Sequence, residues 1–121
     1  MDNKFTNTEK LYRAIYPPEV MEMFWRKDGT LSSAAFADAN GLSVDRGYNR
    51  PESEVITDMT RKFTGRIVSL YVKNCLDIGA IVKYLPSKSN KFHSEIHGSE
   101  NTALLSKSQR FFLAARAVIV H

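Results

Sequence analysis

The sequence predicts a single α+β domain in which a small mixed β-sheet is covered by about three helices. Segments with the period-two alternation of strands are interspersed along the chain with segments that have the apolar spacing of amphipathic helices. With 121 residues, 43% of them apolar, the chain can build one hydrophobic core. We therefore expect one domain over residues 1–121, with residues 1–8 as a candidate flexible tail.

Five segments carry strand patterns. Residues 11–16 alternate apolar residues with small or charged ones and stop before Pro17. Residues 67–72 are apolar except for Ser69, which is typical of a strand buried on both faces. The predicted strands are 11–16, 42–46, 66–71, 80–85 and 92–97, and their order in the sheet stays open.

Residues 51–64 have the most complete helix pattern. Glu52 and Glu54 occupy the first turn and basic residues occupy the last turn, as the helix dipole favours. Gly65 stands where a left-handed C-terminal cap is expected. One helical stripe contains the apolar residues Val55, Ile56, Met59 and Phe63.

Helices are also predicted over residues 18–25 and 106–118. Pro18 suits the first position of the earlier helix, because its fixed φ is compatible with a helix start. Ser106 and Gln109 match the capping box at the start of the later one. We expect Phe111 and Phe112 on the apolar face of this last helix, packed on the sheet.

Two shorter segments have weaker patterns. Residues 32–36 suit a serine-capped helical turn. Residues 72–77 suit a helical turn that ends at Gly79. The stretch 67–85 is therefore either a β-turn-β or a βαβ unit, and its connection is too short to decide between them.

Cysteine count and hydropathy indicate where the protein works. Cys75 is the single cysteine, which excludes an internal disulfide and a four-thiolate zinc site and favours a small buried thiol. No stretch approaches the ~20 apolar residues of a membrane helix, and the first residues lack the apolar region of a secretory signal. We expect a cytoplasmic protein that does not bind membranes.

Charge is distributed unevenly. Residues 1–60 carry seven Lys/Arg and ten Asp/Glu, whereas residues 61–121 carry ten and three, and the net charge is +4. The basic half suits an acidic partner, either a protein or a nucleic acid, although a solvated basic surface is the simpler alternative. The candidate partner-binding residues are Lys83, Lys88, Lys91, Lys107 and Arg110.

Residues 93–97 form the sharpest local pattern. In a strand, alternation places His93, Glu95 and His97 on one face. Imidazoles and a carboxylate are donors for zinc or iron, so these three residues are candidate metal ligands. Ligands spaced by two along a strand lie about 7 Å apart and meet at one ion only if the strand bends. The polar face of a half-buried strand is the alternative.

Several blocks, spread over nearly the whole chain, carry a family resemblance. In this order they resemble a family of small, single-domain bacterial proteins for which no activity is established, which implies an intracellular bacterial protein. The blocks are Leu11-Tyr12-Arg13, Asp28-Gly29, Ser32-Ser33-Ala34-Ala35-Phe36, Leu42-Ser43-Val44-Asp45-Arg46, Gly65-Arg66-Ile67-Val68-Ser69-Leu70 and His93-Ser94-Glu95-Ile96.

A second resemblance concerns the order of four residues. Arg13 near the end of the first predicted strand, Ser33 in the middle, and His93 and Glu95 on a late strand are similar in order to the active-site residues of ADP-ribosyltransferases. In those enzymes an arginine or histidine binds nicotinamide dinucleotide, a serine orders the site, and a glutamate stabilises positive charge on the ribose. The present chain is short and carries a histidine where glutamine or glutamate usually precedes the catalytic acid. Taken singly, Arg13 also suits a surface charge and Ser33 a helix cap.

Two functions follow from these patterns. The first is an accessory binding module whose basic C-terminal half engages an acidic partner. The alternative is a nucleotide-using enzyme with Arg13, Ser33, His93 and Glu95 as catalytic residues, with or without a metal on residues 93–97. The sequence assigns no cofactor and no oligomeric state.

Overall fold

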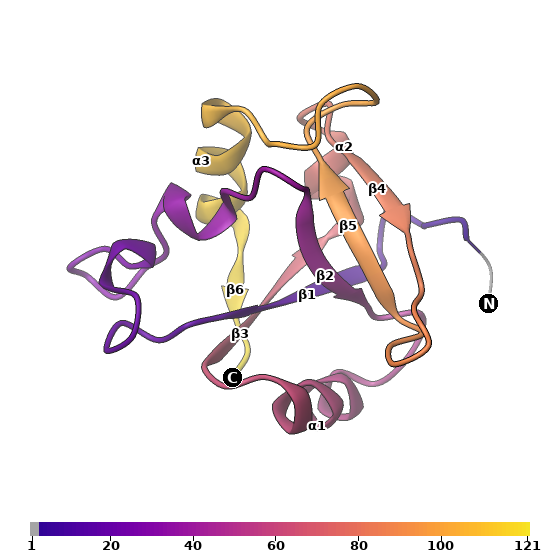
Figure 1. The fold of residues 1–121 in the computed structure, drawn as a ribbon, viewed down its shortest axis with the longest axis horizontal. Coiled ribbons are helices and arrows are strands. Elements are labelled where there is room, and N and C mark those ends of the chain that lie inside the picture. The colour runs from indigo at the N-terminus through magenta and orange to yellow at the C-terminus, as the bar shows by residue number, and fades with distance from the viewer. Residues whose placement is uncertain (1–2) are drawn as a thin grey trace.

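A computed structural model describes residues 3–121 of the chain. It has a six-stranded sheet, three α-helices and two short 3-10 helices (Figure 1). The strands are β1 Lys10–Ile15, β2 Leu42–Arg46, β3 Arg66–Tyr71, β4 Ile81–Tyr84, β5 His93–His97 and β6 Val118–Ile119. The helices are α1 Glu52–Lys62, α2 Val72–Leu76 and α3 Lys107–Arg116, and the 3-10 helices are η1 Glu22–Phe24 and η2 Ser33–Phe36.

The sheet confirms the predicted α+β class and fixes the strand order that the sequence left open. The order is β4-β5-β2-β1-β3-β6, and every neighbouring pair is antiparallel, so the sheet is not mixed. Because β3 and β4 are not neighbours, residues 67–85 are neither a hairpin nor a compact βαβ unit. Helix α2 instead carries the chain from β3 to the opposite edge of the sheet.

Helices cover both faces of the sheet, with α1 on one side and α2 and α3 on the other (Figure 1). The alternation of β1 divides its side chains between the two layers: Leu11 and Ile15 join the larger core, and Tyr12 joins the smaller core under α1. The thiol of Cys75 is buried in the larger core, as expected, and burial raises its pKa to about 12.

The predicted helix over residues 18–25 is wrong. Only a turn after Pro17 and the 3-10 helix Glu22–Phe24 form there. The backbone of Met21 leaves the helical region at φ −136°, and Trp25 forms a β-bridge with Leu31. Tertiary pairing of this segment overrides its local helical spacing.

Helix α1 confirms its predicted position, acidic first turn and basic last turn. It ends differently from the prediction, because Phe63 is already extended and Gly65 lies beyond the cap. Gly65 does have a positive φ of +106°, and a Cβ there would lie 2.4 Å from the carbonyl oxygen of Ile15. This glycine therefore permits the close approach of β3 to β1 rather than closing the helix.

Helix α3 starts with the predicted capping box, in which Ser106 accepts a hydrogen bond from the backbone of Gln109 and Gln109 returns one to Ser106. Its predicted end is wrong, since the helix stops at Arg116 and Val118–Ile119 pairs with β3 as β6. β-branched residues favour this extended state. Phe111, expected in the core, is exposed, whereas Phe112 packs against the larger core.

The N-terminal segment is in contact with the domain from residue 4 onwards. The guanidinium of Arg46 donates to the carbonyl of Lys4 and lies 4.1 Å from the ring centroid of Phe5. Residues 1–2, part of the tail predicted over residues 1–8, lie outside the described residues. The described part of that segment is anchored by Arg46.

Candidate functional site

A cavity of about 320 Å³ opens between the C-terminal half of α1 and the polar face of the sheet. Its volume lies at the lower end of the ~300–1,000 Å³ typical of small-molecule sites. The cavity exists because β1 and β2 pair only at Leu11–Arg46 and Tyr12–Asp45 and then separate. Its lining includes Tyr12, Arg13, Ala14, Tyr16, Ser43, Val44, Asp45, Met59, Lys62, Phe63, Thr64 and His93.

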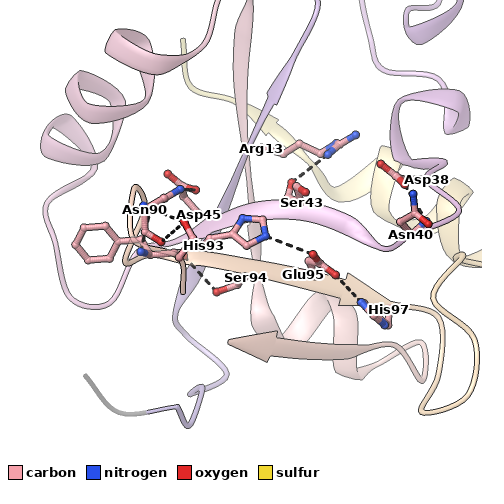
Figure 2. Close-up of polar contacts among 12 residues, drawn as sticks. Arg13, Asp38, Asn40, Ser43, Asp45, Asn90, His93, Ser94, Glu95 and His97 are labelled. Carbon is pink, nitrogen blue, oxygen red and sulfur yellow. Dashed lines mark hydrogen bonds and ion pairs between the residues drawn. The ribbon is translucent and has the colours of Figure 1, made fainter. Parts of the chain in front are cut away.

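Arg13 bridges the gap between the separating strands. Its Nη1 donates to the carbonyl of Ser43 at 3.0 Å (Figure 2). Its Nε donates to the carbonyl of Ala35 at 3.2 Å. Burial lowers the pKa of this guanidinium, and the nearby charge of Asp38 partly offsets that effect. Arg13 thus satisfies a β2 carbonyl that β1 no longer reaches, and its guanidinium points toward Ala35 in the larger core, on the face of β1 opposite Tyr12.

The predicted polar face of β5 forms a hydrogen-bonded row (Figure 2). The Glu95 carboxylate lies between two imidazoles: Oε1 is 2.8 Å from Nε2 of His97, and Oε2 is 3.3 Å from Nε2 of His93. All three side chains are half-buried or more deeply buried. The hydrogen bond from His97 is the main cause that lowers the pKa of Glu95, and His93 adds to it, so Glu95 is a carboxylate at neutral pH.

The metal prediction for His93, Glu95 and His97 is not supported by this arrangement. Among residues 3–121, no group of three or more His, Cys, Asp or Glu residues is arranged to hold a metal ion. Each imidazole here is hydrogen-bonded to the carboxylate through Nε2. The row therefore consists of side chains that satisfy one another.

Of the four predicted catalytic residues, three gather at the cavity. Arg13 and His93 line it, and Glu95 is hydrogen-bonded to His93. Ser33 does not belong to this group, because it lines a separate groove of about 810 Å³ between η2 and α3. The serine expected to order the site therefore lies elsewhere, and neither it nor Ser32 caps η2 through a side-chain hydrogen bond.

Several lining residues are not indicated by the sequence patterns, and Asp45 is the clearest of them. It is buried at 4% exposure, lies directly across from His93 in the β2–β5 register, and accepts a hydrogen bond from Asn90 at 2.8 Å (Figure 2). The strand alternation of residues 42–46 was a usable signal, since it puts Asp45 and Ser43 on one face. Which strand would face them was not visible in the sequence.

The five candidate partner-binding residues occupy different parts of the molecule. Lys83 is half-buried in β4 opposite Glu95, and Lys88 and Lys91 are exposed in the β4–β5 turn. Lys107 and Arg110 lie on α3, which Figure 1 shows at the other end of the molecule from that turn. Arg110 also donates to the carbonyl of Leu105. These residues therefore do not form one continuous patch.

Comparisons with family models, with curated proteins and with solved structures found no match to this chain. Within residues 3–121, none of the helices is both long enough and apolar enough to span a membrane.

Proposed function

We propose that the protein binds a small phosphorylated, nucleotide-like molecule in the cavity between α1 and the sheet. The observation that carries this proposal is that Arg13 and His93, which are distant in sequence, line one cavity and that Glu95 is hydrogen-bonded to His93. A concave site with a few convergent polar groups is the usual form of a small-molecule site.

The lining offers complementary groups for the parts of such a molecule. Lys62 is a cation at the cavity that attracts a phosphate group. Hydroxyl groups of Ser43 and Thr64 and the carboxylate of Asp45 are partners for sugar hydroxyls. Asp45 already accepts a hydrogen bond from Asn90, which reduces its repulsion of an anionic ligand.

His93 is the residue proposed to contact the ligand, with Glu95 as its positioning residue. Glu95 holds Nε2 of the imidazole, and no described residue forms a hydrogen bond with Nδ1. A carboxylate in this position fixes the orientation of an imidazole. The alternative function, a nucleotide-using enzyme, depends on the same two residues, because His93 and Glu95 are its candidate catalytic residues at the cavity.

Binding is tested by two-dimensional NMR titration with AMP and with ribose 5-phosphate. We expect shift changes at the cavity residues Ala14, Ser43 and Thr64. The substitution His93→Ala should weaken binding about 10- to 150-fold, as expected for loss of a hydrogen bond to a charged group. His121→Ala is the matched control, because His121 is exposed and does not line the cavity. Shift changes confined to the η2–α3 groove, or equal effects of the two substitutions, contradict the proposal.

A second proposal keeps the acidic partner and assigns it to the β4–β5 turn. Lys88 and Lys91 are exposed there, which supports contact with a polyanion. Binding to a single-stranded oligonucleotide should weaken steeply with salt, and Lys88→Ala with Lys91→Ala should reduce that dependence. Lys107→Ala on the distant α3 is the control, and an equal effect of this control rules out the turn as the site.

A further inference from the structure

Two exposed aromatic side chains flank the cavity. Tyr16 and Phe63 both line it, and they are 54% and 43% exposed. Residues that line a cavity and are also half exposed lie at its mouth. Single exposed aromatics are ordinary, but two at one opening of a polar cavity require a reason.

Two separate features of the backbone position Tyr16 and Phe63. Tyr16 continues the alternation of β1, which puts it on the same face as Tyr12 and Ala14. Phe63 lies outside the apolar face of α1, because its backbone is extended at φ −127° and ψ 144°. Gly65 holds the two segments together, since a Cβ there would meet both Ile15 and Pro17.

The cavity therefore changes character from its interior to its mouth. Its interior carries the less exposed Asp45 and His93, which suit a sugar and its phosphate, whereas its mouth carries two flat rings. Protein aromatic rings stack on nucleobases of every kind, because every base has a π-face. A sugar phosphate alone would leave both rings without a partner.

We propose that Tyr16 and Phe63 form a base-stacking subsite, so that the ligand is a nucleoside phosphate rather than a sugar phosphate or free phosphate. This inference rests on the proposed function, because it places the sugar and phosphate in the cavity interior. It narrows the ligand class to molecules that carry a nucleobase and assigns two specificity-determining residues.

The structure also supplies a reporter for this subsite. Trp25, the single tryptophan, donates its indole Nε1–H to the backbone carbonyl of Tyr16 at 2.9 Å. The indole N–H therefore gives a single NMR resonance from a group that is hydrogen-bonded to the backbone of Tyr16. Stacking of a base on Tyr16 should move this resonance, whereas a ligand confined to the interior should leave it in place.

The experiment compares AMP, ribose 5-phosphate and inorganic phosphate by calorimetry and by the Trp25 indole resonance. We expect AMP to bind about 5- to 150-fold more tightly than ribose 5-phosphate and to be the one ligand that moves the resonance. Phe63→Ala should remove most of this advantage while leaving ribose 5-phosphate binding unchanged. Phe111→Ala is the matched control, since Phe111 is 55% exposed and lines the other groove.

The outcomes distinguish failure of the base-stacking subsite from failure of the proposed function. Equal affinity for AMP and ribose 5-phosphate, with no effect of Phe63→Ala, overturns the stacking subsite and leaves the proposed sugar-phosphate site intact. Absence of binding by all three ligands overturns both. If Phe63→Ala lowers the thermal midpoint, Tyr16→Phe provides the second measurement: the retained ring should preserve the AMP preference and Tyr16→Ala should abolish it.

Discussion

The guanidinium of Arg46 and the carboxylate of Glu9 form a bidentate ion pair inside the protein, with Nε–Oε2 and Nη2–Oε1 distances of 2.8 Å. The Arg46 side chain has no exposed area, and that of Glu9 is 7% exposed. The rings of Phe5, Tyr48 and Tyr84 surround the same guanidinium. This pair joins the segment before β1 to the end of β2.

Glu9→Gln should lower the free energy of unfolding by about 3–5 kcal/mol, because it removes the negative charge of the carboxylate that is bound bidentately to the buried Arg46 guanidinium. Urea denaturation at neutral pH measures the change. Asp77→Asn is the control, since Lys73 and Asp77 form an exposed ion pair whose loss should cost less than about 1 kcal/mol. Similar losses in the two variants would show that burial does not set the strength of the Arg46–Glu9 pair.

Gly41→Ala should destabilise the protein more than Gly29→Ala. Both glycines have a positive φ, so each substitution carries a backbone strain of about 1–2 kcal/mol. At Gly29 a Cβ meets no atom within 4 Å, whereas at Gly41 it would lie 2.5 Å from Nε2 of His97 and 2.9 Å from Oε1 of Glu95. The added overlap should cost about 1–3 kcal/mol more.

Thermal unfolding of the two variants gives this difference, and the imidazole resonances of His97 report whether its bond to Glu95 is displaced. Equal destabilisation of the two variants would mean that His97 and Glu95 move aside without cost. In that case the row on β5 is not held in place by the segment before β2.

The carboxyl group of Glu95 should titrate below the ordinary value of about 4.3. Because its folded-state pKa is depressed, the stability that it contributes is present above the unfolded-state pKa and is lost as the pH falls through the folded-state pKa. His97→Ala should raise the pKa of Glu95 more than His93→Ala does, since the bond from His97 is the shorter and is the main cause. Carboxyl ¹³C NMR between pH 2 and 7 measures the midpoints, and the reverse order contradicts the assignment.

The elements that could be predicted from the sequence are those whose signals are local. The capping box at Ser106 and the charged ends of α1 depend on neighbours within a few residues, and both were confirmed. The end of α3 could not be predicted, because Val118 continues the helical apolar spacing and only its pairing with β3 makes it extended. The helix expected over residues 18–25 failed for the same reason, through the pairing of Trp25 with Leu31.

The candidate site was predictable only in part. Alternation was enough to place His93, Glu95 and His97 on one face. The cavity itself results from the separation of β1 and β2 beyond Tyr12 and Asp45, and strand order and register are long-range properties. For this reason the sequence indicated Arg13 and His93 but not Asp45, Tyr16 or Phe63 as residues of one site.

Ala14→Leu should fill the cavity and abolish ligand binding without unfolding the protein. Ala14 is half-buried, lines the cavity where β1 and β2 separate, and packs against the edge of the smaller core, so a larger apolar side chain fills cavity space beside that core. We expect a change of less than about 1.5 kcal/mol in the free energy of unfolding and a loss of AMP binding of at least about 10-fold. Ala115→Leu, which places a larger side chain in the η2–α3 groove, is the matched control and should leave AMP binding unchanged. If Ala14→Leu binds AMP normally while Ala115→Leu does not, the ligand occupies the second groove, and the roles given to Lys62 and His93 are wrong.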